Sequence, residues 1–77
     1  MKYVTLLNDN GTNTIINEFT NLNSAFESFN TLDVEDLEDN QEYELAKYDE
    51  DNQVLDWEDS ELVSLNQPLN QWVIKAK

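Results

Sequence analysis

Cysteine, histidine and arginine are all absent from this 77-residue chain, which also has a single glycine and a single proline. Without cysteine or histidine there is no disulfide and no thiolate or imidazole ligand for a metal. Catalysis by Cys–His or Ser–His–Asp residues is excluded for the same reason, and the lone Gly11 cannot form a glycine-rich phosphate loop. The sequence therefore predicts a protein that is not an enzyme and holds no cofactor.

Long hydrophobic runs are also absent. The apolar run Tyr3–Leu7 is cut short by Asn8 and Asp9, which is not the pattern of a signal peptide. No apolar stretch approaches the roughly 20 residues that a membrane-spanning helix needs. We therefore expect a cytoplasmic protein without a membrane partner, located in the host cytoplasm if a phage encodes it.

Enough hydrophobic residues remain to build a small folded domain. They make up 39% of the chain, and eight residues are aromatic. A disordered acidic tail would contain few aromatic residues, so residues 1–77 are predicted to form a single acidic domain. Because so short a chain buries only roughly 60% of its unfolded surface, its stability depends on close packing or on self-association. A homodimer is compatible with this requirement.

Negative charge is the dominant feature of the composition. Seventeen acids face four lysines, which gives a formal net charge of −13. This exceeds the magnitude of about 2–8 that keeps a small domain soluble, and it makes the folded chain repel itself. Nucleic acids and anionic membranes would be repelled by such a protein, whereas a basic protein surface would be attracted.

The excess charge is confined to the middle of the chain. Residues 33–61 hold fourteen acids and one cation, Lys47. Residues 1–32 carry a net charge of −2, and residues 62–77 contain two lysines and no acid. Apolar residues are interspersed through the middle segment, which indicates that its acids are displayed on folded structure. Residues 33–61 are therefore the predicted working surface.

The first third of the chain predicts a β-hairpin. Residues 2–7 (KYVTLL) and 14–19 (TIINEF) are rich in strand-forming residues. Between them lies Asn10-Gly11, the strongest short signal for a hairpin turn, because both residues tolerate a positive φ.

A helix is predicted next, because one apolar stripe has helical spacing. The stripe consists of Leu22, Ala25, Phe26, Phe29 and Leu32. Its start has three candidate caps, Thr20, Asn21 and Asn23, and the run from Ser24 to Glu27 has the form of a capping box. Residues 33–37 form either a short helical turn or a loop.

A second hairpin is predicted from residues 42–49 (EYELAKYD) and 54–58 (VLDWE). Alternation places Tyr43 and Leu45 on one face of the first strand and Glu44 on the other.

The end of the chain is predicted to add a loop and a strand. Pro68 argues against regular pairing in residues 64–70, whereas residues 71–76 (QWVIKA) read as a final strand. The predicted fold is thus α+β, a small antiparallel sheet of two hairpins and a C-terminal strand with one helix packed on a face.

The candidate partner-binding surface is the acidic middle segment. Alternate residues on one face of a strand lie about 7 Å apart, a spacing comparable to that of successive backbone phosphates. We therefore expect Glu42 and Glu44 to form rows with Asp56 and Glu58 of the second strand. The predicted partner-binding residues are Asp36, Glu38, Asp39, Glu42, Glu44, Asp49, Glu50, Asp51, Asp56, Trp57, Glu58, Asp59 and Glu61.

Two hypotheses apply to the tryptophans Trp57 and Trp72: each is either a core residue or an anchor at an interface with a partner. Trp72 is assigned to the core because it lies in a predicted strand of a domain short of core residues. Trp57 stands among Asp56, Glu58 and Asp59, so it is a candidate contact for a partner.

A calcium site is not predicted, although Asp49-x-Asp51-x-Gln53 has the beginning of an EF-hand loop. Val54 stands where the turn glycine belongs, and Ser60 stands where the bidentate glutamate belongs.

These features favour an acidic inhibitor that mimics nucleic acid. It would block the basic DNA- or RNA-binding surface of an enzyme such as a restriction, CRISPR or DNA-repair nuclease. Its composition is broadly similar to that of phage-encoded anti-defence proteins. Two alternatives are an immunity protein for a toxic nuclease and a small structural or assembly subunit whose acids serve solubility. The expected partner is a basic nucleic-acid-binding protein or nuclease, with no direct contact to nucleic acid.

Overall fold

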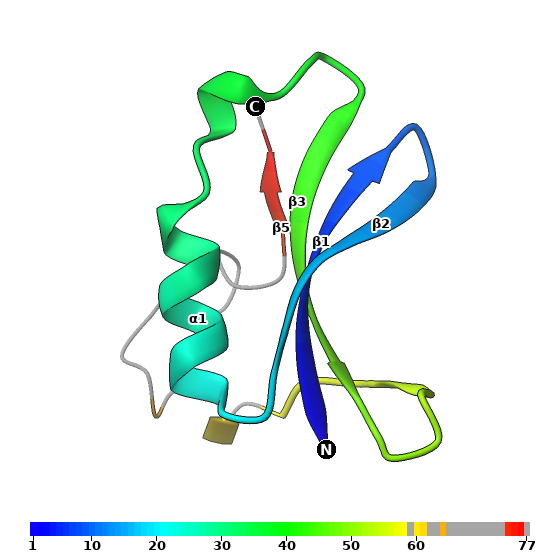
Figure 1. Cartoon of the computed structure of the whole chain (residues 1–77), viewed down its shortest axis with the longest axis vertical. Coiled ribbons are helices and arrows are strands. Elements are labelled where there is room, and N and C mark those ends of the chain that lie inside the picture. The colour runs from blue at the N-terminus through cyan, green and yellow to red at the C-terminus, as the bar shows by residue number, and fades with distance from the viewer. Residues whose placement is uncertain (59, 62–63, 65–73, 77) are drawn as a thin grey trace.

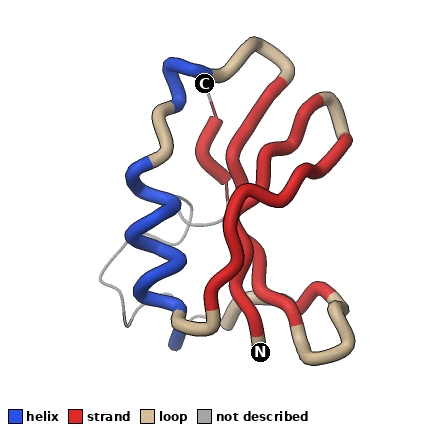
Figure 2. The backbone as a smooth tube through the Cα atoms, viewed as in Figure 1, coloured by secondary structure: helices blue, strands red, loops and turns tan. Residues whose placement is uncertain are grey.

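The computed structural model describes residues 1–58, 60–61, 64 and 74–76, and it has an α+β fold (Figure 1). The elements in chain order are β1 (Lys2–Asp9), β2 (Thr12–Phe19), α1 (Leu22–Thr31), the 3-10 turn η1 (Val34–Asp36), β3 (Gln41–Tyr48), β4 (Val54–Leu55) and β5 (Ile74–Ala76). The helix forms one layer against the sheet (Figure 2). The predicted fold, two hairpins and a C-terminal strand with one packed helix, is confirmed.

The sheet is antiparallel throughout, with the strand order β2-β1-β3-β4. Its centre is the long pairing of β1 with β3, which runs from Lys2↔Tyr48 to Asp9↔Gln41 and joins the two hairpins. The other edge of β3 is shared by two short strands. β4 pairs with Lys47 and Tyr48 at the end of β3, and β5 pairs with residues 42–44 at its start.

The first hairpin turns at Asn10 and Gly11, as predicted, with φ angles of 52° and 91°. Two successive positive φ angles give the type of turn that matches the right-handed twist of the strands. The side-chain oxygen of Asn8 accepts a hydrogen bond from the backbone N–H of Gly11 at 2.9 Å. Further along, the register shifts between Thr5↔Asn17 and Leu6↔Ile15, so Ile16 is the extra residue of a β-bulge.

The helix begins at its cap, Asn21, whose side-chain oxygen accepts a hydrogen bond from the N–H of Ser24 at 3.1 Å. Asn21 was one of the three predicted caps. The predicted capping box starting at Ser24 is wrong, because Ser24 lies inside the first turn and cannot be the cap. The predicted apolar stripe does face the sheet, with Ala25 and Phe29 fully buried.

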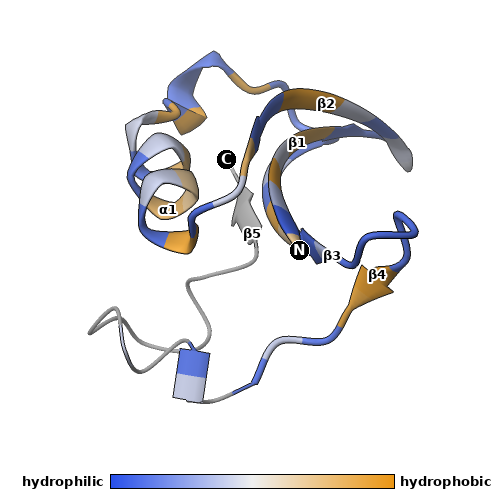
Figure 3. Cartoon of the chain, turned by 60° about the horizontal axis from the view of Figure 1, so that its bottom comes forward, coloured by the Kyte–Doolittle hydropathy of each residue, from blue (hydrophilic) through white to orange (hydrophobic). Residues whose placement is uncertain are grey.

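Two clusters of buried residues lie on opposite faces of the sheet. On the helix face, Ala25, Phe29 and Leu45 pack together, and Tyr43 lies on this face as predicted. On the other face, the buried residues are Val4, Leu6 and Ala46, with Tyr48 packed against them. No helix of the described residues covers this second face; the sheet curls toward it, as Figure 3 shows for β1 and β2.

Some predicted boundaries were wrong. The strand expected over residues 54–58 ends at Leu55, because Trp57 leaves the sheet edge and packs on Tyr3. Residues 33–37, for which the sequence allowed either a helical turn or a loop, contain the turn η1, and Asp33 is its N-terminal cap. The last strand is described over Ile74–Ala76 alone. Trp72, and all of the predicted loop 64–70 except Ser64, lie outside the described residues.

Candidate functional site

The first group of acids lies on the connection from α1 to β3, where the backbone is held by local contacts. Asp33 accepts a hydrogen bond from the N–H of Glu35 at 2.9 Å. Leu37 is buried and anchors the segment to the core. Between these anchors Glu35 and Asp36 are exposed. The predicted residues Glu38 and Asp39 follow and are also exposed. Asp39 interacts with another group of the protein.

The second group consists of Glu42 and Glu44 in the first half of β3. Because residues two apart in a strand share a face, both lie on the face opposite α1, as predicted for Glu44. Both are half-buried. Burial, and secondarily the charge of Glu42, raises the pKa of the Glu44 carboxyl above its ordinary value. Packing two carboxylates here therefore costs the fold some stability.

The third group occupies the turn between β3 and β4. One carboxylate oxygen of Asp49 accepts hydrogen bonds from the N–H groups of Asp51 and Gln53, each at 2.9 Å. Asn52 completes the turn with a φ of 62°. Asp49 thus shapes the turn, while Glu50 and Asp51 are exposed at its tip. These hydrogen bonds give the EF-hand-like run a structural explanation that needs no calcium.

The fourth group follows β4. Asp56 and Glu58 are exposed, whereas Trp57 between them is half-buried. The Trp57 ring stacks on the Tyr3 ring, with centroids 6.2 Å apart and planes inclined by 24°. Trp57 belongs to the cluster on the helix face. Its role as a partner contact stays a prediction, and the structure shows its packing role.

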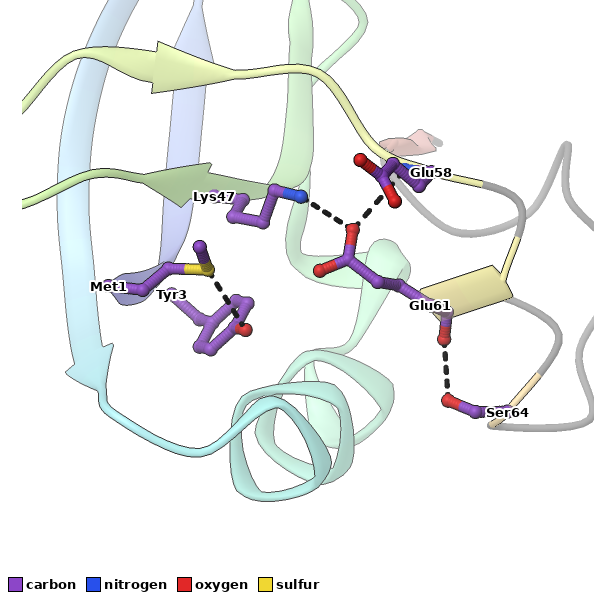
Figure 4. Close-up of polar contacts among 6 residues, drawn as sticks. All are labelled: Met1, Tyr3, Lys47, Glu58, Glu61 and Ser64. Atoms are coloured by element: carbon purple, nitrogen blue, oxygen red, sulfur yellow. Dashed lines mark hydrogen bonds and ion pairs between the residues drawn. The ribbon is translucent and has the colours of Figure 1, made fainter.

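Lys47 is the one cation of the acidic segment, and it is buried, with 4% of its surface exposed. Its ammonium group pairs with Glu61 at 2.5 Å (Figure 4). The same group lies 5.6 Å from the centre of the Trp57 ring. The same Glu61 carboxylate accepts a hydrogen bond from the N–H of Glu58 at 3.3 Å. The hydrogen bond from Lys47 lowers the pKa of Glu61 below its ordinary value.

This pairing was missed from the sequence, although a signal for it existed. Strand alternation places Lys47 on the same face as Tyr43 and Leu45, which were predicted to point together. A lysine in that position requires a partner, since a buried unpaired charge is costly. Glu61 supplies it, so this predicted partner-binding acid has an internal ion pair.

The predicted residues are therefore not gathered into one row. β4 pairs beside Lys47 and Tyr48, at the opposite end of β3 from Glu42, so the expected cross-strand rows with Asp56 and Glu58 are not formed. Glu44 and Asp56 do line one shallow hollow of about 180 Å³ at the β3 edge. The remaining acids extend from the top connection to the bottom turn of Figure 1. Asp59 lies outside the described residues.

Within the part of the chain that the structure describes, no group of three acids is placed to hold a metal ion. None of the described helices is long and apolar enough to cross a membrane. No protein-family model matches this chain, no curated protein shows significant similarity to its sequence, and no solved structure matches its fold.

Proposed function

We propose that this protein binds the basic nucleic-acid-binding surface of an enzyme and inhibits it by taking the place of DNA or RNA. The enzyme would be a nuclease of restriction, CRISPR or DNA-repair type, encountered in the cytoplasm. The observation that carries the proposal is the uncompensated charge of the acidic segment. Its one cation, Lys47, is buried and paired with Glu61, so it does not offset the acids around it.

The charge density supports the proposal quantitatively. Residues 33–58 contain twelve acids. Two of them lie in the eight-residue strand β3, which is about 25 Å long, and the other ten lie in the connections on either side of it and after β4. A stretch of duplex DNA about 25 Å long carries about 15 phosphate charges, at roughly one per 1.7 Å. The two numbers of charges are similar, which supports the proposal that a basic groove for DNA binds this segment.

The backbone that carries the acids is ordered by local hydrogen bonds, which favours binding. Asp33 and Asp49 hold two of the acidic turns through backbone N–H groups. Charges placed on a preorganised backbone lose less conformational entropy on binding than charges on a disordered tail. The tips Glu50 and Asp51 are exposed and free to meet lysine or arginine side chains.

The experiment is a salt-gradient pull-down from nuclease-treated bacterial lysate, with an unrelated acidic domain of equal charge as the control. The proposal expects a nucleic-acid enzyme that this protein alone retains, that elutes at a defined salt step, and that duplex DNA displaces. Retention that is unchanged by salt would contradict the proposal and would point to an assembly subunit bound through apolar contacts.

Two matched variants locate the surface. Neutralising Glu50 and Asp51 to Gln and Asn removes two charges from the acidic segment. Neutralising the exposed acids Glu18 of β2 and Glu27 of α1 removes the same charge from elsewhere. We expect the first pair to weaken binding about 2- to 30-fold, from about 0.2–1 kcal/mol per exposed contact, and the second pair to change it little. Equal losses would show that net charge alone drives binding.

A further inference from the structure

The strand β2 is the outer edge of the sheet, and its free side is unprotected. It spans eight residues, of which all but Phe19 are exposed. No strand or helix of the described residues pairs with that side, and β2 lies at the outside of the fold in Figure 1. An edge of this kind presents unpaired N–H and C=O groups that accept another strand.

The first six residues of β2 lack the charges and the proline that commonly prevent strand pairing. Residues 12–17 (TNTIIN) contain no charged residue and no proline, in a chain of which 27% is charged. Ile15 and Ile16 are 54% and 37% exposed. The single charge of the strand, Glu18, is paired with Lys2 at 3.2 Å. The bulge at Ile16 twists the edge but leaves four uncharged residues before it.

Electrostatics decide which partner fits this edge. A basic segment would find no acid on residues 12–17 to attract it. A second copy of this chain would be repelled wherever residues 33–61 approach their counterparts, because they carry fourteen acids. At the uncharged edge of β2, two copies would meet without apposing carboxylates.

We propose that two copies of the chain pair through β2, antiparallel and about a two-fold axis, and so form one continuous sheet. A two-fold axis sets each edge against the same edge of its partner. The contact consists of two short strands and the exposed Ile15 side chains, so it falls below the roughly 1,200 Å² of a standard interface. We therefore expect a dissociation constant in the micromolar range or weaker.

The acids predict how salt affects this dimer. From β3 of one copy to β3 of the other there are five strand spacings, a distance of about 24 Å. That is about three times the screening length of roughly 8 Å at physiological ionic strength, but it is less than the roughly 30 Å at 0.01 M salt. Repulsion between the acidic segments is thus screened by salt, and the dimer tightens as salt is added. Binding to a basic partner changes in the opposite direction, so the two proposals fail independently.

Sedimentation equilibrium of the purified full chain tests the dimer. It would be run over protein concentrations from about 10 μM to about 1 mM, at about 0.02 M and about 0.5 M NaCl. We expect a monomer–dimer equilibrium whose dissociation constant falls roughly tenfold or more between the two salts. Ile15→Lys places like charges on facing strands and should leave the protein monomeric. Val54→Lys is the matched control, since Val54 is 69% exposed, lies in another strand and makes the same change in charge.

The outcomes divide cleanly. A dimer that strengthens with salt, is lost in Ile15→Lys and persists in Val54→Lys supports the proposal. A chain that stays monomeric at about 1 mM in both salts overturns it, as does association that weakens with salt or survives Ile15→Lys. Far-UV circular dichroism confirms that both variants are folded. If Ile15→Lys is unfolded, Thr14→Lys on the same edge replaces it with the same expected result.

Discussion

Replacing Glu61 with glutamine should destabilise the fold strongly, although it removes one charge from a protein that carries an excess of thirteen. Lys47 is 4% exposed, and Glu61 is its acidic partner. Breaking a buried ion pair by removing one partner costs about 3–5 kcal/mol. Because the Glu61 side chain is 25% exposed, we expect a cost below that range, about 2–3 kcal/mol. A chain of this length has a stability of about 4–12 kcal/mol in total.

The assay is urea unfolding at neutral pH, followed by far-UV circular dichroism. Glu58→Gln is the matched control because Glu58 is exposed and lies three residues away. Its removal relieves repulsion, so the free energy of unfolding should stay equal or rise slightly. If Glu61→Gln were as stable as Glu58→Gln, the ion pair would contribute nothing, and the reasoning would be wrong.

The pH dependence has a defined sign. The pKa of Glu61 is lowered in the folded protein, mainly by the hydrogen bond from Lys47. Its contribution is therefore complete above the ordinary pKa of the carboxyl group and is lost as the pH falls through the lowered value. The difference between wild type and Glu61→Gln should shrink over that acidic range. Lys47→Met in the Glu61→Gln background should recover much of the loss, because replacing both partners leaves no buried charge.

Four further substitutions test other parts of the fold. Glu44→Gln should raise the free energy of unfolding at pH 7 by less than about 1 kcal/mol, because burial and the charge of Glu42 raise the pKa of Glu44. This gain in stability should vanish once the pH falls below the ordinary pKa of a carboxyl group. Thr5→Val should raise the free energy of unfolding in urea by about 1 kcal/mol, because the buried Thr5 hydroxyl has no hydrogen-bond partner among the described residues. A loss of stability would show that the hydroxyl does have a hydrogen-bond partner. Gly11→Ala should lower the thermal unfolding midpoint and the free energy of unfolding, the latter by about 1 kcal/mol, because Gly11 has a φ of 91°. Asn10→Gly should leave the stability nearly unchanged, because glycine accepts a positive φ.

The two proposals together describe a dimer with an acidic segment on each outer side. If both hold, the acidic segment of each copy lies away from the shared β2 edge. The dimer then has two acidic segments, and each can bind one basic surface. Linking two binding sites raises the apparent affinity without any new contact, provided that the geometry allows both to engage. Comparing Ile15→Lys with wild type in the pull-down measures that contribution.

Local signals in the sequence predicted the strands and the helix of this fold, although not all of their ends. Asn10-Gly11 specifies its turn because few residue pairs accept two positive φ angles, and the spacing from Leu22 to Leu32 identifies the sheet-facing side of α1. The concentration of acids in residues 33–61, from which the proposal of a basic partner starts, is also read from the sequence alone.

Tertiary structure decided the rest, because it depends on which distant segments meet. The pairing of β1 with β3, and the sharing of one β3 edge by β4 and β5, join residues far apart in the chain. That arrangement separates Glu42 from Asp56, which strand alternation alone had put into rows. It also buries Lys47 beneath Trp57 and beside Glu61, turning a predicted contact acid into the counterion that the buried lysine requires.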